Sequence, residues 1–180
     1  LDECWIDLTD CCEILGDRTK TIENGRRIAE EISRRIRREL GITVSIGVSW
    51  NKIYAKLGSD YKKPDAITVF DRYNYRKLIF PLPASELLYV GRQTSKKLAS
   101  CGIHTIGELA AANPSYLHSF FGKVGLMLSV FARGEDQTPV NDLGVEAPIK
   151  SVGNSTTTPR DLVNNEDVRL VLYLLAESVS

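Results

Sequence analysis

The stretch from residue 41 to residue 64, GITVSIGVSWNKIYAKLGSDYKKP, limits the fold of this chain more than any other part of its sequence. Over residues 42–48, isoleucine and valine alternate with threonine, serine and glycine, which is the period of a strand that buries one face. At Asn51 the period changes to that of a helix, and Pro64 prevents this helix from continuing. The stretch therefore predicts a buried strand, a short helix and a tight turn, in that order.

The predicted helix has one apolar face and one basic face. Ile53 and Leu57 are four residues apart, as are Lys52 and Lys56, so each pair lies on one side of the helix. A lysine pair at residues 62–63 follows, and this arrangement suits a site for a polyanion. An ordinary strand–helix unit with a solvated basic face explains the same pattern. The candidate N-cap residues are Ser49 and Asn51.

The composition allows one domain or two small ones in 180 residues, with 43% apolar residues for a core. Lysine plus arginine and aspartate plus glutamate number 23 each, so the net charge is zero. A dedicated nucleic-acid binder usually has a basic excess, and any polyanion site must therefore be local. No apolar run reaches the roughly 18 residues that span a membrane, and no signal-peptide pattern opens the chain.

The four cysteines do not have the spacing of a disulfide framework or a zinc site. Cys11 and Cys12 are neighbours, which rarely bridge each other, and no histidine is near them at ligand spacing. We expect buried, reduced thiols in a cytosolic protein. The first residue is Leu1, directly before a charged pair, and from this we expect the sequence to be an excerpt of a longer chain.

Residues 1–10, LDECWIDLTD, alternate in a way that predicts a strand of mixed character. Asp2 and Glu3 are adjacent carboxylates, which a bulge or a strand end can turn toward one ion. Carboxylate oxygens are the ligands that Mg²⁺ takes, and two-metal phosphoryl transfer needs several of them. A solvated strand edge is the alternative interpretation.

Residues 21–40 predict an amphipathic helix that ends at Gly41, because isoleucine or leucine recurs every four residues from Ile28. Arginines crowd its last turns, where they complement the helix dipole; phosphate binding is the alternative role. A short strand at 66–70 and a short helix at 73–79 are expected next. Prolines at positions 81 and 83 then mark a domain boundary.

Two glycine turns beyond this boundary resemble each other. Residues 88–92, LYVGR, lead into a helix that ends at Gly102, and residues 121–125, FGKVG, lead into one that ends near Gly134. Each turn places backbone amides at a helix N-terminus beside a basic residue, a geometry that holds phosphate without reading bases. With the helix expected at 103–112, they predict a helix-hairpin-helix pair that grips one DNA backbone. Two ordinary helix–helix turns are the alternative.

The C-terminal part begins with an extended linker at 140–150, followed by a small polar segment at 151–160. Asp161 or Asn164 then caps a helix with valine and leucine on one face. We expect the first strand and helix of a further, truncated domain here.

Together, these segments resemble the Y-family translesion DNA polymerases over essentially the whole chain. Residues 45–64 are similar to the signature S-I-G-x-x-x-N-K-x-x-A-K-x-x-S-D-x-x-K-P in order and spacing. Residues 1–10 look like the strand that supplies two palm carboxylates. Residues 82–110 look like the helix-hairpin-helix thumb, and residues 150–162, KSVGNSTTTPRDL, resemble the start of the little finger.

The resemblance implies a DNA-directed DNA polymerase that extends a primer by low-fidelity, lesion-bypassing synthesis with two Mg²⁺ ions. Asp2 and Glu3 would be catalytic metal ligands, and Lys63 would hold the phosphates of the incoming deoxynucleoside triphosphate. Residues 151–158 would run along the template backbone. The implied DNA-binding residues are Val90, Gly91, Arg92, Thr94, Gly122, Lys123, Gly125, Ser151 and Thr156.

The sequence also departs from the family pattern. The family's first palm strand, with another catalytic aspartate, and its fingers are missing, so we predict that the 180-residue chain does not polymerise. Tyr89 stands where the hairpin usually has its first glycine, and Asp65-Ala66 replaces Asn-Gly. The alternative function is a non-catalytic module that binds the DNA backbone; a nucleotidyl cyclase is disfavoured because it has no use for DNA-gripping hairpins.

The predicted fold class is α/β (α+β), with a partial mixed-sheet palm followed by a small all-helical thumb and a truncated β–α stub. The expected partners are primer-template DNA, a deoxynucleoside triphosphate and a sliding clamp bound outside this chain, with no membrane. We expect a cytoplasmic, nucleoid-associated protein in a bacterium, and self-association through an exposed sheet edge. The predicted domains are the palm at 1–80, the thumb at 81–138, a linker at 139–149 and the little-finger start at 150–180.

Overall fold

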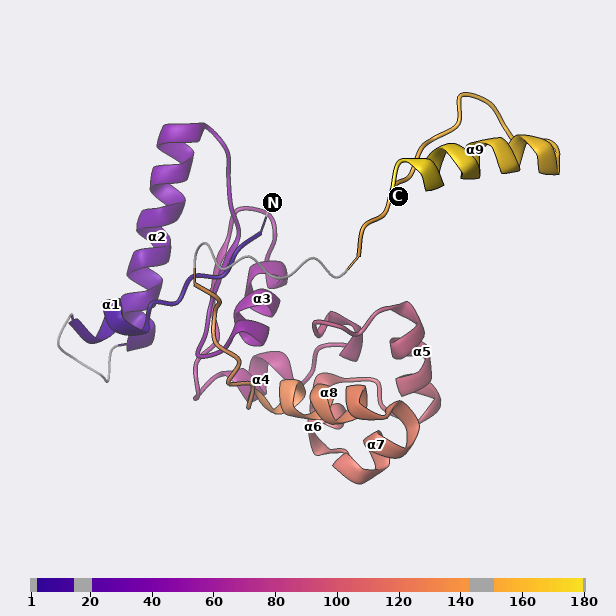
Figure 1. The fold of residues 1–180 in the computed structure, drawn as a ribbon. Coiled ribbons are helices and arrows are strands. Elements are labelled where there is room, and N and C mark those ends of the chain that lie inside the picture. Colours follow the sequence, from indigo (N-terminus) through magenta and orange to yellow (C-terminus); the bar gives the residue numbers. More distant parts are fainter. Residues whose placement is uncertain (1–2, 15–20, 143–150, 180) are drawn as a thin grey trace. The chain divides into compact units, whose positions relative to one another are not determined.

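Two short parallel strands, β1 (Ile46–Val48) and β2 (Ile67–Val69), form the sheet and are joined by helix α3 (Lys52–Tyr61). The computed structural model describes residues 3–14, 21–142 and 151–179 (Figure 1). In the register of the sheet, Ile46 pairs with Ile67 and Val48 pairs with Val69. The predicted strand–helix–strand order is confirmed, although both strands are shorter than expected.

Helix α3 packs on one face of the strands so closely that β1 needs a glycine there. A Cβ atom on Gly47 would lie 1.8 Å from the Ala55 carbonyl oxygen and 2.5 Å from the Ser59 nitrogen. Gly58 faces this position, because a Cβ built on it would come 3.1 Å from the Gly47 Cα. The alternation of the signature therefore places a residue without a side chain where the helix crosses the strand.

Helix α2 (Thr21–Leu40) lies on the other side of the strands from α3 (Figure 1) and contacts both strands. Ala29 is buried in this contact, and a Cβ on Gly25 would come within 3.0 Å of the Val48 side chain. The predicted apolar stripe is confirmed in its middle, but Leu40 at its end is 68% exposed. The arginines of α2 pair largely within the helix, for example Arg26 with Glu30 and Arg35 with Glu39.

Residues 3–8 do not form the predicted strand. They have no regular secondary structure, and helix α1 (Thr9–Ile14) begins where the strand was expected to end. Asp7 explains this start, because its carboxylate accepts hydrogen bonds from the backbone amide and hydroxyl of Thr9. A strand also needs a neighbour for its backbone groups, and the described sheet consists of β1 and β2 alone.

Short helices make up the rest of the first part of the chain, and each has a local reason to begin. Thr105 and Glu108 form a capping box, and Pro114 occupies the first turn of a helix capped by Asn113. Gly134 ends the last of them with a φ of 71°. The elements are α4 (Tyr75–Ile79), the 3₁₀ helix η2 (Ala84–Glu86), α5 (Arg92–Ser100), α6 (Ile106–Ala111), α7 (Pro114–Phe121) and α8 (Lys123–Arg133).

One hydrophobic core runs from α3 to α8. Its fully buried side chains include Tyr54 and Phe70 from the sheet region and Leu98, Leu117 and Leu128 from the later helices. Residues 1–140 accordingly form one compact unit, and residues 141–180 form a second. The division of the first unit into a palm and a thumb at residues 80–81 stays a prediction.

The second unit contains helix α9 (Asn165–Glu177), and Asn164 caps it by accepting a hydrogen bond from the Asp167 amide at 2.8 Å. This confirms one of the two predicted caps. The described residues of this unit contain no strand, and part of the predicted linker and strand lies outside them. None of the side chains of α9 is buried; Leu172 and Leu174, for example, are 59% and 69% exposed.

The expectation of buried thiols is wrong for two of the described cysteines. Cys4, Cys11 and Cys101 are free, but Cys4 and Cys11 are exposed, because the N-terminal segment that carries them lies at the surface.

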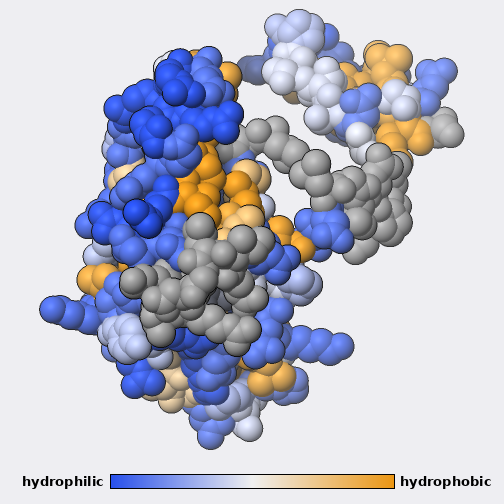
Figure 2. Space-filling model, turned by 90° about the vertical axis from the view of Figure 1, so that its left-hand side faces the viewer, coloured by the Kyte–Doolittle hydropathy of each residue, from blue (hydrophilic) through white to orange (hydrophobic). Residues whose placement is uncertain are grey.

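Among the described helices, none is both long enough and apolar enough to cross a membrane. Figure 2 shows hydrophobic surface, in orange, gathered between hydrophilic regions, in blue, on the face turned to the viewer.

Candidate active site

Helix α3 is fixed at its start and along its apolar face, and this orients its polar side chains. Asn51 caps the helix by accepting a hydrogen bond from the Tyr54 amide at 2.8 Å. Of the two predicted N-cap candidates, Ser49 and Asn51, the second is therefore confirmed. Ile53 and Leu57 are buried beneath the helix. Its remaining polar face lies toward the N-terminal segment, where the Trp5 indole donates a hydrogen bond to the Lys52 carbonyl at 3.0 Å.

Four charged side chains meet on this face: Glu3, Lys56, Asp60 and Lys63, here called the carboxylate–lysine cluster. The Lys56 ammonium lies 2.6 Å from Glu3 Oε1 and 3.0 Å from Asp60 Oδ2. The Lys63 ammonium lies 2.5 Å from Asp60 Oδ1 and 3.9 Å from Glu3 Oε1. Two carboxylates and two ammonium groups therefore form one neutral network at the C-terminal end of α3.

The cluster is partly open to solvent, and its members stabilise each other's charges. Lys56 is 19% exposed and Lys63 is 49% exposed. Burial alone would lower the pKa of Lys56, but its hydrogen bonds to Glu3 and Asp60 raise it above the ordinary value. Burial likewise acts to raise the pKa of Asp60, and the hydrogen bonds from Lys63 and Lys56 lower it overall. Lys56 and Asp60 are therefore both charged at neutral pH.

The cluster joins two residues that the sequence placed in one site. Glu3 and Lys63 are 60 positions apart in the chain, and the structure brings their charged groups together. Asp2, the other predicted carboxylate, lies outside the described residues. Sequence analysis missed Asp60 and gave Lys56 only a place on a basic face. The available signal was that Asp60 follows Lys56 by four residues on the predicted helix and precedes Lys63 by three.

A metal ion would find one predicted ligand among the described residues. Glu3 offers a carboxylate oxygen, the donor that Mg²⁺ prefers, and its half-exposed side chain can be reached from solvent. In the described part of the chain, no three metal-binding side chains lie together. Glu3 therefore fits such an ion as one ligand, and further ligands must come from elsewhere.

The first predicted phosphate grip is at the start of α5. Gly91 is its N-cap residue, and no side chain caps this end of the helix, so the first-turn amides are free to bind an anion. Gly91 and Arg92 are exposed, and Thr94 lies half-buried one turn on. Val90 differs, because it is buried and its amide donates to the Leu87 carbonyl at 3.0 Å.

Tyr89, where the family hairpin usually has a glycine, adopts a φ of 68°, a conformation that glycine takes without strain. Tyr89 is 65% exposed, and the centroid of its ring lies 6.1 Å from that of the Phe131 ring. The chain thus keeps the backbone shape of the glycine turn and adds an aromatic side chain at its tip.

The second predicted grip is at the start of α8. Gly122, with a φ of 60°, ends α7 and begins α8, no side chain caps α8, and Lys123 beside it is exposed. Gly125 has a different environment. A Cβ there would come 2.2 Å from the Leu117 carbonyl oxygen, and its amide already donates to the Gly122 carbonyl at 3.0 Å. The structure thus explains Gly125 by the close packing of α7 on α8.

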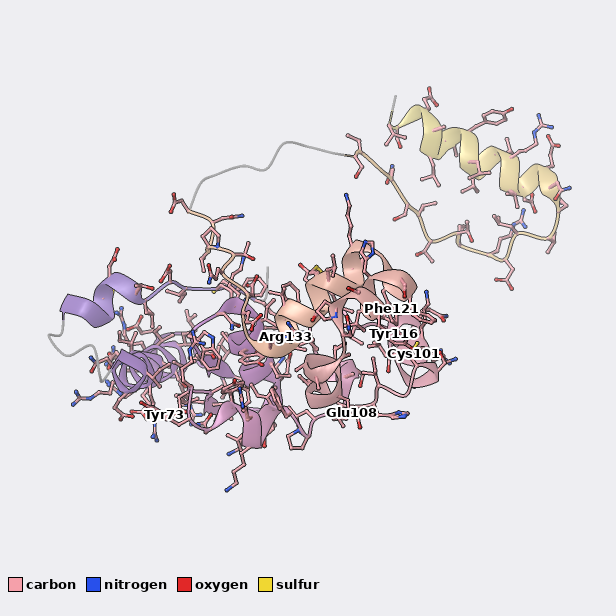
Figure 3. The ribbon with its side chains drawn as sticks, turned by 90° about the horizontal axis from the view of Figure 1, so that it is seen from below. Tyr73, Cys101, Glu108, Tyr116, Phe121 and Arg133 are labelled. Carbon is pink, nitrogen blue, oxygen red and sulfur yellow. The ribbon has the colours of Figure 1, made fainter. Side chains whose placement is uncertain are left out.

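Two of the predicted DNA-binding residues belong to the second unit, and the first unit has a surface hollow of its own. Ser151 and Thr156 are exposed in the second unit. A shallow hollow of about 620 Å³ is lined partly by Cys101, Glu108 and Tyr116, which Figure 3 labels. This hollow contains none of the predicted site residues.

Comparison with known proteins gives separate matches for the region of the carboxylate–lysine cluster and for the helices that follow it. A family model described as the impB/mucB/samB family matches residues 1–60, and one described as the thumb domain of DNA polymerase iota matches residues 86–136. The chain is 52% identical over 179 residues to DNA polymerase IV of Acetivibrio thermocellus, covering 99% of this chain and 43% of that protein. It is 38% identical over 180 residues to DNA polymerase IV 1 of Bacillus subtilis, covering 100% and 41%.

Solved structures give the same assignment. A Y-family DNA polymerase chimera of Dbh and Dpo4 matches with a TM-score of 0.66 and 28% identity, over 76% of this chain and 38% of that one. DinB from Sulfolobus solfataricus matches with a TM-score of 0.64 and 29% identity, over 75% and 38%. The chain spans less than half the length of these relatives. In sequence and in fold, it belongs to the Y-family of DNA polymerases.

Proposed function

We propose that the full-length gene product is a DNA-directed DNA polymerase, and that Glu3 and Lys63 serve the same incoming nucleotide. The 3.9 Å between the Glu3 carboxylate and the Lys63 ammonium carries this proposal, because one triphosphate with its metal ion spans that distance easily. The curated relatives named above are DNA polymerases, and one matching structure is described as an insertion ternary complex of Dbh DNA polymerase.

In this proposal, each described residue has a separate task. The Lys63 ammonium binds the triphosphate of a deoxynucleoside triphosphate, and the ion pair with Lys56 holds the Glu3 carboxylate in place. Glu3, together with Asp2, would hold Mg²⁺, which when bound supplies charge stabilisation for in-line attack by the primer 3′-hydroxyl. The amides that begin α5 and α8, with Arg92 and Lys123, bind DNA phosphates without reading sequence.

We also propose that the synthesis is low-fidelity and bypasses lesions, as the family resemblance implies, and that a sliding clamp binds outside this chain. The 180 residues on their own should not extend a primer, because they correspond to only 43% of the length of the DNA polymerase IV of Acetivibrio thermocellus.

Primer extension by the full-length gene product tests this proposal, with Mg²⁺, all four deoxynucleotides and a labelled primer-template. We expect extension by the wild type and by a Glu30→Ala control, which removes a carboxylate of α2 paired with Arg26. Glu3→Ala should lower incorporation at least about a thousandfold while the DNA affinity stays unchanged. Incorporation that survives in Glu3→Ala would favour the alternative, a module that only binds the DNA backbone.

A further inference from the structure

Asp60 is the residue on which both lysines of the carboxylate–lysine cluster converge. Its Oδ1 atom lies 2.5 Å from the Lys63 ammonium and its Oδ2 atom lies 3.0 Å from the Lys56 ammonium. Asp60 is in the last turn of α3, and Lys63 follows beyond the end of the helix. The helix thus holds one end of this ion pair rigidly, and the other end belongs to a turn.

Among the described residues, Asp60 is the carboxylate closest to the Lys63 ammonium. The Lys63 side chain is 49% exposed, and the next described carboxylate, that of Glu3, is 3.9 Å from its ammonium. A lysine of this exposure samples many rotamers, and fixing one of them costs conformational entropy when a ligand binds. A partner that confines the ammonium beforehand reduces this cost.

Asp60 can hold Lys63 without repelling a polyanion strongly, because Lys56 occupies its second oxygen. The Lys56 ammonium is the less exposed of the two and bridges Asp60 to Glu3. The charges of Glu3, Lys56, Asp60 and Lys63 sum to zero. The network therefore presents the Lys63 ammonium at the outer side of a locally neutral cluster.

We infer that Asp60 is a positioning residue for the incoming nucleotide. Asp60 holds the Lys63 ammonium near Glu3 until a triphosphate takes the place of Asp60 as the partner of Lys63. The inference rests on the proposed function and adds a residue to it. Asp60 itself does not touch the nucleotide. Its effect should therefore appear in nucleotide binding, pass entirely through Lys63 and leave the chemical step unchanged.

Single-nucleotide incorporation by the full-length gene product tests the inference with Asp60→Asn, which keeps the shape of the side chain and removes its charge. We expect the KM for the deoxynucleotide to rise three- to tenfold, with kcat within twofold of wild type and an unchanged Kd for primer-template DNA. Asp60→Glu, which restores the charge on a longer side chain, should recover at least half of the loss in KM.

The matched control is Asp65→Asn. Asp65 lies two residues beyond Lys63 and is also a half-exposed carboxylate, but it pairs with Arg37. Asparagine tolerates its φ of 54°. This variant should leave KM within twofold of wild type. If both substitutions change KM equally, a general loss of negative charge explains the effect and the inference is wrong.

Coupling to Lys63 separates positioning from a merely structural effect. In a Lys63→Ala background, Asp60→Asn should cause no further rise in KM, because the group that it positions is gone. A further rise of the same size, an unchanged or lowered KM in the single variant, or a fall in kcat at constant KM would each overturn the inference. Absence of any incorporation by the wild type would instead contradict the proposed function.

Discussion

Trp50 and Gly134 are joined by a hydrogen bond of 2.9 Å from the indole Nε1 to the carbonyl oxygen, although 84 residues separate them. Asn51 donates a second hydrogen bond to the same oxygen at 3.0 Å, and the Tyr54 hydroxyl donates to the Ala132 carbonyl at 2.8 Å. Burial raises the pKa of Tyr54 far above its ordinary value, so this hydroxyl remains a donor. The start of α3 and the end of α8 are therefore fixed to each other.

Gly134→Ala should destabilise the protein by about 2–4 kcal/mol, combining the strain of a left-handed residue with a clash. The new Cβ would lie 2.6 Å from Tyr54 Cε2 and 3.0 Å from Trp50 Cζ2. Urea unfolding measures the effect. Gly102→Ala is the matched control, because Gly102 has a φ of 75° but nothing within 4 Å of a Cβ, and it should cost only about 1–2 kcal/mol. Equal losses in the two variants would contradict the clash.

Gly47→Ala should disrupt the contact between β1 and α3 and displace the carboxylate–lysine cluster. No rotamer change can relieve the clash, because the atom 1.8 Å from the new Cβ is the backbone carbonyl oxygen of Ala55. We expect a loss of more than about 3 kcal/mol in the free energy of unfolding. Gly153→Ala, at a position with open space around it, should stay within about 0.5 kcal/mol of wild type. A stable Gly47→Ala variant would show that α3 does not pack as described.

These two glycines also show what the sequence could and could not reveal. The alternation around Gly47 and the period of α3 are local patterns, so the strand–helix–strand unit and the cap at Asn51 were predictable. The hydrogen bonds to the Gly134 carbonyl were not predictable, because the residues that donate them are more than 80 positions away in the chain. The predicted role of Gly134 was only to end a helix, which it does.

The candidate site likewise contains residues that were predictable from the sequence and one that was not. Glu3 and Lys63 were paired from a family signature, and the structure places them together. The part of Asp60 in the network depends on which side of α3 meets the N-terminal segment, and no local pattern specifies that. The wrong strand prediction for residues 1–10 has a related cause: alternation shows which residues could line a strand, but a strand forms only beside a partner.

Lys123→Ala should weaken binding of duplex DNA and reduce its salt dependence. If the Lys123 ammonium contacts one phosphate, the slope of log Kd against log salt concentration should fall by about 0.9. Fluorescence anisotropy of the full-length gene product with labelled primer-template at several salt concentrations measures this slope. Lys77→Ala, which removes another exposed lysine, from α4, should leave the slope unchanged. The same slope in all three proteins would contradict a grip at the start of α8.

The capping box of α6 should make stability depend on pH. Hydrogen bonds from the His104 amide first, and then from the Thr105 amide, lower the pKa of Glu108 below its ordinary value of 4.5. The ionised form therefore stabilises the folded state above about pH 4.5, and this contribution is lost as the pH falls through the lower folded-state pKa. The Tm difference between wild type and Glu108→Ala should be largest near neutral pH and shrink toward pH 3. A difference that does not vary with pH would show that the charge is not involved.

The central claim, that Glu3 and Lys63 act on one nucleotide, is tested most directly by single-turnover incorporation with Lys63→Ala in the full-length gene product. The account predicts that the Kd for the incoming deoxynucleotide rises about tenfold or more while primer-template affinity is unchanged. Lys62→Ala, the neighbouring lysine whose ammonium lies over the Tyr61 ring, should bind the nucleotide as wild type does. An unchanged nucleotide Kd in Lys63→Ala would contradict the account.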